Sequence, residues 1–331
     1  MSSSIESSIL LICPLFFGYD KSIRKELEGR GYIVDVFNAD PGGVQGTLIS
    51  TLRTFHIGEK KVIRWFENRL LNKLNKKYDI VVVVCGWAIT SYSVKNIRNN
   101  NLKPSGKMLL YYWDSLELLK DDITRWPFFD KIYTFDRNDY ENHRDIFDFL
   151  PLFYCNQYLE LKEKAHLYNL ATIGSYKYDR YFLIEDLKTR NEEITFVSYM
   201  YSPKWEILFH KAFRKKYKDI KLENLSFKKL SFGEIIGMYE ETDAVLDIPR
   251  TGQNGLTMRT IECLAMKKKV ITTNPNVANY DFYNPSNIYI MDSNTLELPN
   301  KQWFTLPYCE IDSKIVDNYS ITNWVNILLK D

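Results

Sequence analysis

Residues 244–274, AVLDIPRTGQNGLTMRTIECLAMKKKVITTN, decide the fold. Two short apolar runs rich in β-forming residues, 245–248 and 270–272, stand near the two ends of this stretch. Between them, apolar residues recur at the spacing of one helix face, at Met258, Ile261, Leu264 and Ala265. The stretch therefore predicts a strand, a glycine-bearing loop, a helix and a second strand, which is one unit of a parallel α/β sheet.

The loop and the start of this helix have the composition of an anion site. Gly252 and Gly255 allow sharp backbone turns, and Thr257 is a residue type that caps helices. Loop N–H groups and the positive end of the helix dipole would then face one ligand, most naturally a phosphate or diphosphate. Arg259 and Glu262 follow, three positions apart, as ligand contacts or as an ordinary ion pair worth about 0.2–0.5 kcal/mol. Glycine loops of this kind also occur in proteins that bind nothing there.

The segment GLTMRTIECLAMKKKVITTN resembles the nucleotide-sugar signature of GT-B glycosyltransferases, in which a glycine loop and a helix carrying a Glu precede a strand. With VLDI before it and NYDFYNPSNIYIMD after it, the string is similar to bacterial transferases that build capsular polysaccharide, O-antigen or lipopolysaccharide core. The specific match covers a small part of the chain. The resemblance implies an α/β protein of GT-B type, with two Rossmann-like parallel-sheet domains facing a cleft.

The resemblance also implies roles for individual residues. Glu262 would hold the donor ribose hydroxyls, and the loop amides would hold the diphosphate, at Asn254, Gly255, Leu256 and Thr257. Many relatives of the retaining type carry a second Glu at the position that is Asn254 here. Its absence favours transfer with inversion of configuration.

Length and charge agree with a two-domain globular protein. The 331 residues exceed the ~250–300 at which one hydrophobic core usually splits. We expect an acceptor-binding domain at 1–155, a nucleotide-sugar-binding domain at 156–305 and a tail at 306–331. The resemblance implies that a helix of this tail packs back on the first domain. A net charge of +2, without a basic-aromatic motif, excludes nucleic acid as an expected partner.

Cysteine spacing and hydropathy bear on the compartment. The five cysteines are widely spaced and contain no CxxC pair, which is typical of reduced core residues in a cytoplasmic protein. No run approaches the ~20 apolar residues that cross a bilayer. Residues 59–77 predict a basic amphipathic helix that either packs on a sheet or touches anionic lipid at the inner face of the membrane. Membrane contact is therefore expected, if at all, to be peripheral.

In the first half, strands are expected at 9–15, 32–37, 80–85, 108–113 and 131–135, with an irregular region from 38 to 58. Asp114 follows two tyrosines and a tryptophan where a strand ends, which suits a general base for the acceptor hydroxyl; a helix cap is the alternative. Asp136 and His143 form a second, weaker acid-base group, for which a structural pair or a helix cap is the alternative.

In the second half, strands are expected at 169–174, 194–199 and 288–291, and helices at 232–241 and 321–330. Arg180 follows the first of these strands, where a guanidinium can clamp a diphosphate. Lys204 occupies the matching place after the second strand; a solvated surface charge is the alternative for both. Arg180, Arg259 and the loop amides would stabilise the leaving diphosphate, so we expect neither a metal ion nor a cofactor.

Together these residues predict a glycosyltransferase that moves a sugar from a nucleotide-sugar donor to a saccharide or lipid-linked saccharide acceptor. Two alternatives remain open: a polyol-phosphate or other phosphate-linked transferase, and a non-catalytic nucleotide-sugar-binding assembly subunit. Donor turnover would separate the enzymes from the binding subunit.

Overall fold

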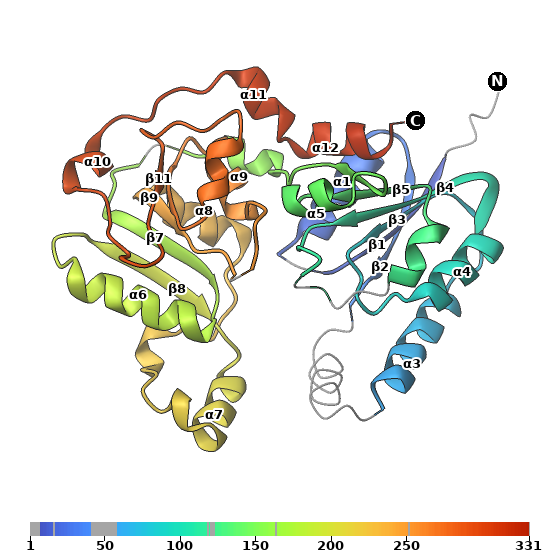
Figure 1. The fold of residues 1–331 in the computed structure, drawn as a ribbon, viewed down its shortest axis with the longest axis horizontal. Helices are drawn as coiled ribbons and strands as arrows, with labels where there is room; N and C mark the ends of the chain where they lie inside the picture. Colours follow the sequence, from blue (N-terminus) through green and yellow to red (C-terminus); the bar gives the residue numbers. More distant parts are fainter. Residues whose placement is uncertain are drawn as a thin grey trace. The chain divides into compact units, whose positions relative to one another are not determined.

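The computed structural model describes residues 7–15, 17–40, 58–117, 119, 123–162, 164–250 and 252–330 (Figure 1). Most of the irregular region expected from residue 38 to residue 58 lies outside these ranges. The chain divides into two compact units. Unit 1 comprises Met1–Cys155, Thr251–Leu256 and Asn318–Asp331, and unit 2 comprises Asn156–Arg250 and Thr257–Asp317.

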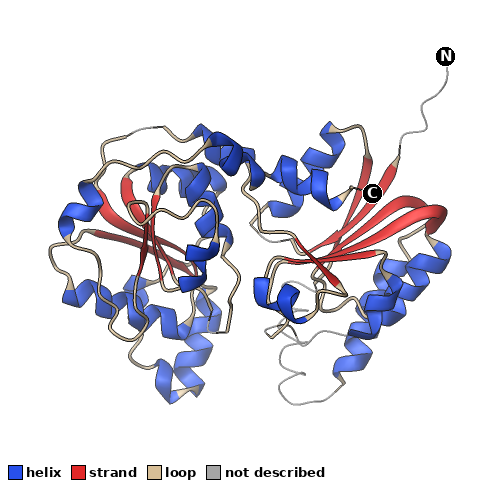
Figure 2. Cartoon of the chain, turned by 45° about the horizontal axis from the view of Figure 1, so that its top comes forward, coloured by secondary structure: helices blue, strands red, loops and turns tan. Residues whose placement is uncertain are grey.

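Unit 1 is built on a sheet of six parallel strands in the order β2-β1-β3-β4-β5-β6. The strands are β1 (Ser8–Cys13), β2 (Ile33–Asn38), β3 (Tyr78–Val84), β4 (Leu102–Tyr112), β5 (Lys131–Thr134) and β6 (Phe147–Phe149). Every residue of β1 is buried, as are the four valines of β3. Continuous apolar runs of this kind form central parallel strands because helices cover both faces of the sheet (Figure 2).

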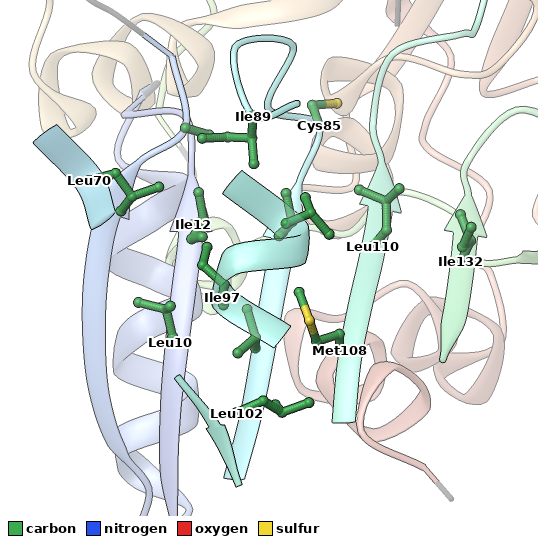
Figure 3. Close-up of a cluster of buried hydrophobic side chains, with 14 of the residues drawn as sticks. Leu10, Ile12, Leu70, Cys85, Ile89, Ile97, Leu102, Met108, Leu110 and Ile132 are labelled. Atoms are coloured by element: carbon green, nitrogen blue, oxygen red, sulfur yellow. The ribbon is translucent and has the colours of Figure 1, made fainter. Parts of the chain in front are cut away.

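Helices pack on both faces of this sheet. They are α1 (Tyr19–Gly29), α3 (Glu59–Leu71), α4 (Ser91–Asn100), α5 (Arg137–Asn142) and the C-terminal α12 (Ile321–Leu328), with a 3₁₀ helix η1 (Ile123–Phe128). Figure 3 shows side chains of β1 and β4, among them Leu10 and Leu110, gathered with Leu70 of α3 and Ile97 of α4. This apolar cluster is the core of unit 1 on one face of its sheet.

The C-terminal helix α12 belongs to unit 1. The backbone N–H of Tyr154 donates to the carbonyl of Tyr319 at 2.9 Å, which joins the segment before α12 to the end of the first long stretch of the unit. Arg30, at the end of α1, donates to Asn326 Oδ1 at 2.7 Å. Trp324 is 1% exposed, with its ring centroid 4.9 Å from that of Tyr111. Helix α12 therefore completes the core of this unit.

Unit 2 repeats the strand order of unit 1 with five parallel strands, β11-β10-β9-β7-β8. The strands are β7 (Tyr168–Ser175), β8 (Phe196–Tyr201), β9 (Thr242–Asp247), β10 (Lys269–Thr272) and β11 (Ile288–Ile290). The helices are α6 (Tyr178–Arg190), α7 (Lys204–Phe213), α8 (Phe232–Glu240), α9 (Met258–Ala265), α10 (Lys301–Thr305) and α11 (Ser313–Asn318). The strand, helix and strand expected within residues 244–274 are β9, α9 and β10.

The strand order identifies one special place in each sheet. The order of winding reverses between β1 and β3 in unit 1, and between β7 and β9 in unit 2. At such a point the connections on the two sides leave the sheet in opposite directions, so a crevice opens outside the carboxyl ends of the strands. The residues that follow β7 and β9, and those that follow β1, β2 and β4, therefore lie where a ligand of such a sheet binds.

Candidate functional site

Two guanidinium groups meet at the reversal point of unit 2. Strand β7 is followed by α6, whose first turn carries Arg180, and β9 is followed by the loop that leads to α9 and Arg259. A Cβ atom placed on Gly174, near the end of β7, would lie 3.0 Å from Arg259 Nη2 and 3.6 Å from Arg180 Nη1. The absence of a side chain at Gly174 thus makes room for both cations.

Arg180 is held by the end of β9. Its Nη2 donates to the backbone carbonyl of Ile248 at 2.7 Å. Burial and the neighbouring charge of Arg259 lower the pKa of Arg180 to about 10, and Arg250 acts in the same direction. The guanidinium remains charged at neutral pH, but it is crowded by other cations, so an anion placed beside it would relieve unfavourable electrostatic energy.

The start of α9 is tied to the end of β9 by one carboxylate. Asp247 is 1% exposed, and its Oδ2 accepts from the hydroxyls of Thr257 at 2.6 Å and Thr260 at 2.7 Å. Its Oδ1 accepts from Arg259 Nη1 at 3.1 Å, and Arg259 Nη2 also donates to the carbonyl of Ile173. Thr257 caps α9, as predicted, by accepting the N–H of Thr260. The acidic partner of Arg259 here is Asp247, so this arginine is positioned by the fold.

Further positive charge gathers beside Arg180. Partial burial lowers the pKa of Lys177, and the nearby charges of Arg250 and Arg180 lower it further, against a raising effect of Glu206. Arg250 stands three residues beyond the last residue of β9, and its side chain is exposed. Sequence reasoning did not select Arg250, although its place just after a buried strand was the available signal. The arrangement has the electrostatics of a site for a multiply charged anion.

Glu262 and Lys204 occupy different surroundings. Glu262 lies in α9 and is 5% exposed. Burial raises the pKa of Tyr239; the charge of Arg259 lowers this pKa, and the charge of Glu262 raises it. Glu262 therefore lies close to Tyr239. Lys204 is the first residue of α7, and its Nζ lies 5.8 Å from the centroid of the Phe227 ring. The structure thus brings Arg180, Arg259 and the α9 residues together and places Lys204 against an aromatic ring.

The loop before α9 belongs to unit 1 and is already engaged there. The N–H of Gly255 donates to Asp136 Oδ2 at 3.0 Å, and a Cβ on Gly255 would overlap the ring of Phe135. Leu256 is buried, while Asn254 is partly exposed. The Gly255 amide thus donates within unit 1 to Asp136, and the assignment of the loop amides from Asn254 to Thr257 to a diphosphate stays a prediction.

Asp136 and His143 have structural surroundings. Asp136 is fully buried, caps α5 by accepting the N–H of Asn138 at 2.9 Å, and also accepts from the hydroxyl of Ser115. His143 ends α5 with its ring centroid 5.7 Å from that of Phe147. The helix-cap alternative for Asp136 is the one that the geometry favours, since its carboxylate is enclosed by these donors.

A pair of carboxylates lies at the carboxyl edge of the unit 1 sheet. Asp114 follows β4 and is partly exposed, and Asp40 follows β2. Burial and the negative charge of Asp114 raise the pKa of Asp40 to about 7, while Arg125 and the backbone N–H of Trp87 oppose this rise. Sequence reasoning selected Asp114 and not Asp40. A carboxyl whose pKa lies near neutrality can take up and release a proton at physiological pH.

A buried arginine shapes the loop beside these carboxylates. Arg125 is 0% exposed and donates to the backbone carbonyls of Gly86 and Ile89 at 2.7 Å and of Cys85 at 2.6 Å. These bonds fix the chain just after β3, one of the two strands at the reversal point of this unit. Arg125 therefore combines a loop-holding role with a positive charge near Asp40.

Two further properties concern the described residues as a whole. Within the described ranges, no group of three or more His, Cys, Asp and Glu side chains has a geometry that could hold a metal ion. Among the helices that the structure describes, none has both the length and the apolar character needed to cross a membrane.

No protein-family model and no curated protein sequence matches the chain. Several solved structures are similar to this chain. A glycosyltransferase from Rickettsia africae ESF-5 is 13% identical, with 98% of this chain and 97% of that chain covered and a TM-score of 0.58. AviGT4, a glycosyltransferase involved in avilamycin A biosynthesis, is 13% identical over 97% of this chain and 95% of that chain, with a TM-score of 0.52. MurG from Acinetobacter baumannii is 12% identical, with 98% of this chain and 100% of that chain covered and a TM-score of 0.50. The chain thus has the fold of GT-B glycosyltransferases, with two parallel-sheet α/β domains.

Proposed function

We propose that this chain is a glycosyltransferase that moves a sugar from a nucleotide-sugar donor to a saccharide or lipid-linked saccharide acceptor in bacterial surface polysaccharide synthesis. The observation that carries the proposal is the gathering of Lys177, Arg180 and Arg250 at the reversal point of the unit 2 sheet. A nucleotide sugar presents a diphosphate, and guanidinium groups bind phosphate oxygens through paired, charge-assisted hydrogen bonds. The fold shared with glycosyltransferases supports the same reading.

In the proposed donor site each group has a separate task. Arg180 and Arg250 bind the diphosphate and stabilise the negative charge that grows on it as the sugar leaves, which is why the proposal includes no metal ion. Arg259 is held in place by its ion pair with Asp247 and is mostly buried. Its charge adds to the positive potential at the start of α9. Glu262 is assigned to the ribose hydroxyls, and Lys204 to a secondary position at the edge of the site.

In the proposed reaction the acceptor oxygen forms a bond to the anomeric carbon, and the bond from that carbon to the diphosphate oxygen breaks. The acceptor proton passes to a carboxylate, for which Asp114 is our candidate because it is partly exposed at the carboxyl edge of its sheet. Burial and the negative charge of Asp114 raise the pKa of Asp40 to about 7, so a proton is held readily on this neighbouring carboxyl. A single displacement of this kind inverts the configuration at the anomeric carbon.

The test is turnover of UDP-, GDP-, CMP- and dTDP-sugars by the purified chain, with the released nucleotide identified. Release of a nucleoside diphosphate is expected for glycosyl transfer from the diphosphate donors. Arg180→Gln should lower donor affinity about 10- to 100-fold, because charge-assisted hydrogen bonds to the diphosphate are lost. Lys188→Ala, a matched loss of charge near the far end of α6, should leave affinity unchanged.

Asp114→Asn separates chemistry from binding. It should reduce turnover by about 10²–10⁴-fold while donor affinity is kept, since it removes only the proton acceptor. Donor binding without turnover under all conditions would instead favour the non-catalytic subunit. Release of a nucleoside monophosphate from one of the diphosphate donors would favour a phosphate-linked transferase, because the bond between the two phosphates would then be the one that breaks. Absence of any nucleotide binding would contradict the proposal.

A further inference from the structure

Helix α7 of unit 2 carries an apolar face that is exposed to solvent. The large side chains on this face are Trp205, Leu208, Phe209 and Phe213, which are 58%, 45%, 52% and 75% exposed. Their spacing places them along one side of the helix, and the rings of Phe209 and Phe213 pack together with centroids 4.8 Å apart. Ile207, on the other side, is buried in the unit 2 core. Figure 1 shows α7 beyond the end of β8, clear of the sheet.

The basic helix α3 of unit 1 offers a useful contrast. Sequence reasoning considered this helix for lipid contact, yet Leu70 is 4% exposed, and Phe66 and Leu71 pack against the unit 1 core. Much of its apolar face is therefore covered by its own unit. Among the described residues of α3, Trp65 is the only large hydrophobic side chain that is exposed. In α7 the equivalent face has four such residues and stays open. An exposed cluster of this kind marks a docking surface.

Positive charge follows directly on this apolar face. From residue 204 to residue 219 the chain has six Lys or Arg and two Asp or Glu, a net +4, whereas the whole chain carries +2. Arg214, Lys215 and Lys218 are exposed, and no ion pair among the described residues includes them. The surface therefore has the charge that complements an anionic partner.

The basic turn is firmly attached to α7. Lys211 Nζ donates to the carbonyls of Lys218 at 2.7 Å and Ile220 at 2.6 Å, which ties the turn back to the helix. Tyr217, in the 3₁₀ turn η3 (Lys215–Tyr217), is buried with its ring centroid 4.7 Å from that of His210. These contacts fix the backbone of the basic turn directly beside the end of the apolar helix α7.

We propose that α7 and η3 together dock the protein on an anionic lipid bilayer. Trp205, Leu208, Phe209 and Phe213 enter the boundary between headgroups and acyl chains, and Arg214, Lys215 and Lys218 contact lipid phosphates. Aromatic and aliphatic side chains beside lysine and arginine are the composition of interfacial membrane helices. The proposal does not depend on the donor site, because it rests on the exposed face and charge of α7 alone.

The experiment is co-sedimentation of the full chain with vesicles of phosphatidylcholine alone and of phosphatidylcholine mixed with phosphatidylglycerol. The unmodified protein should bind the mixed vesicles, and binding should weaken as salt is raised. Phe209→Ser with Phe213→Ser should reduce binding at least about tenfold through lost apolar burial. Lys215→Glu with Lys218→Glu should reduce binding to the mixed vesicles about fivefold or more for each residue changed.

Trp65→Ser is the matched control, since it removes an exposed aromatic residue from the basic helix α3 and should leave binding unchanged. All of these positions are exposed, so thermal unfolding should show intact variants. Vesicle binding that persists in both α7 variants would overturn the proposal. So would an absence of vesicle binding accompanied by self-association that Phe209→Ser with Phe213→Ser abolishes, because the face would then be a protein interface.

Discussion

At the scale of single residues, Asp40 has a pKa far above that of an ordinary aspartate, which makes its effect on stability measurable. Its carboxyl has a pKa raised from 3.8 to about 7 by burial and by Asp114. The folded protein therefore holds a proton on Asp40 between about pH 4 and pH 7 that the unfolded chain releases. The stabilisation from this neutral carboxyl is complete below about pH 4 and is lost as pH rises through about 7.

We therefore expect Asp40→Asn to remove a decline of stability between about pH 4 and pH 7. At pH 8 the variant should be more stable than the unmodified protein, by up to about 4 kcal/mol, because a shift of one pKa unit corresponds to roughly 1.4 kcal/mol. Urea unfolding across this pH range measures the difference. Asp35→Asn is the control. In the unmodified protein, hydrogen bonds from Lys76 and Tyr78 lower the pKa of Asp35 against the effect of burial. Asp35 therefore does not cause the decline, and the decline should remain in this variant. An unchanged pH profile for Asp40→Asn would show that Asp40 does not titrate as the structure implies.

The residues of the two sites differed in how far the sequence could identify them. The sequence identified Thr257 because a capping residue next to a glycine loop is a local pattern. It identified Arg180 because this residue closely follows a predicted strand. Asp40 and Arg125 were not selected. Their roles depend on strand order, which brings the ends of β2, β3 and β4 together across long stretches of sequence. Local spacing contains no information about such meetings.

At the scale of elements, the sequence predicted every strand except the short edge strand β6, whereas several helices were not predicted. Parallel strands buried on both faces are continuous apolar runs, and β1, β3 and β9 lie within a few residues of the expected positions. Helix α6 was not predicted, since its buried residues Tyr181, Ile184 and Leu187 are interspersed with partly buried aromatic and aliphatic residues that blur the helical period. Helix α7 was missed for a related reason: its apolar residues do not face a core.

The loop before α9 gives a prediction at this scale. Gly255→Ala should destabilise the protein by about 1–3 kcal/mol, because the new methyl group would overlap the ring of Phe135. Gly237→Ala in α8 is the matched control: its Cβ would enter open space, and alanine favours a helix over glycine by about 0.5–1 kcal/mol. Thermal unfolding should therefore shift down for the first variant and up for the second. A Gly255→Ala protein as stable as the unmodified chain would contradict the packing described for this loop.

At the scale of the whole molecule, two units contain sheets of the same strand order, and unit 1 is completed by a segment distant in sequence. Unit 1 receives its last helix from the C-terminus, where Trp324 packs on Phe153 with ring centroids 4.8 Å apart. The resemblance to GT-B enzymes implied a returning tail, which no periodicity in the sequence could have placed. The duplication of strand order was likewise invisible locally, since it is a property of pairing between strands.

Trp324 allows the role of this returning helix to be measured. Trp324→Ala should lower the unfolding free energy by about 3–5 kcal/mol, because it leaves a large cavity against Tyr111 and Phe153. Trp205→Ala, at an exposed tryptophan, should change stability by less than about 0.5 kcal/mol. Denaturant unfolding of both variants gives the comparison. Equal effects would mean that α12 is not part of the unit 1 core.

The central claim is that the cations at the reversal point of unit 2 bind a diphosphate. Calorimetric titration with a nucleoside diphosphate and with the same nucleoside lacking phosphates tests it most directly, using the base that the donor screen identifies. The unmodified protein should bind the diphosphate at least about 100-fold more tightly, and Arg180→Gln with Arg250→Gln should reduce that advantage to about tenfold or less. Equal affinities for the two ligands, or an advantage unaffected by the two substitutions, would contradict the account.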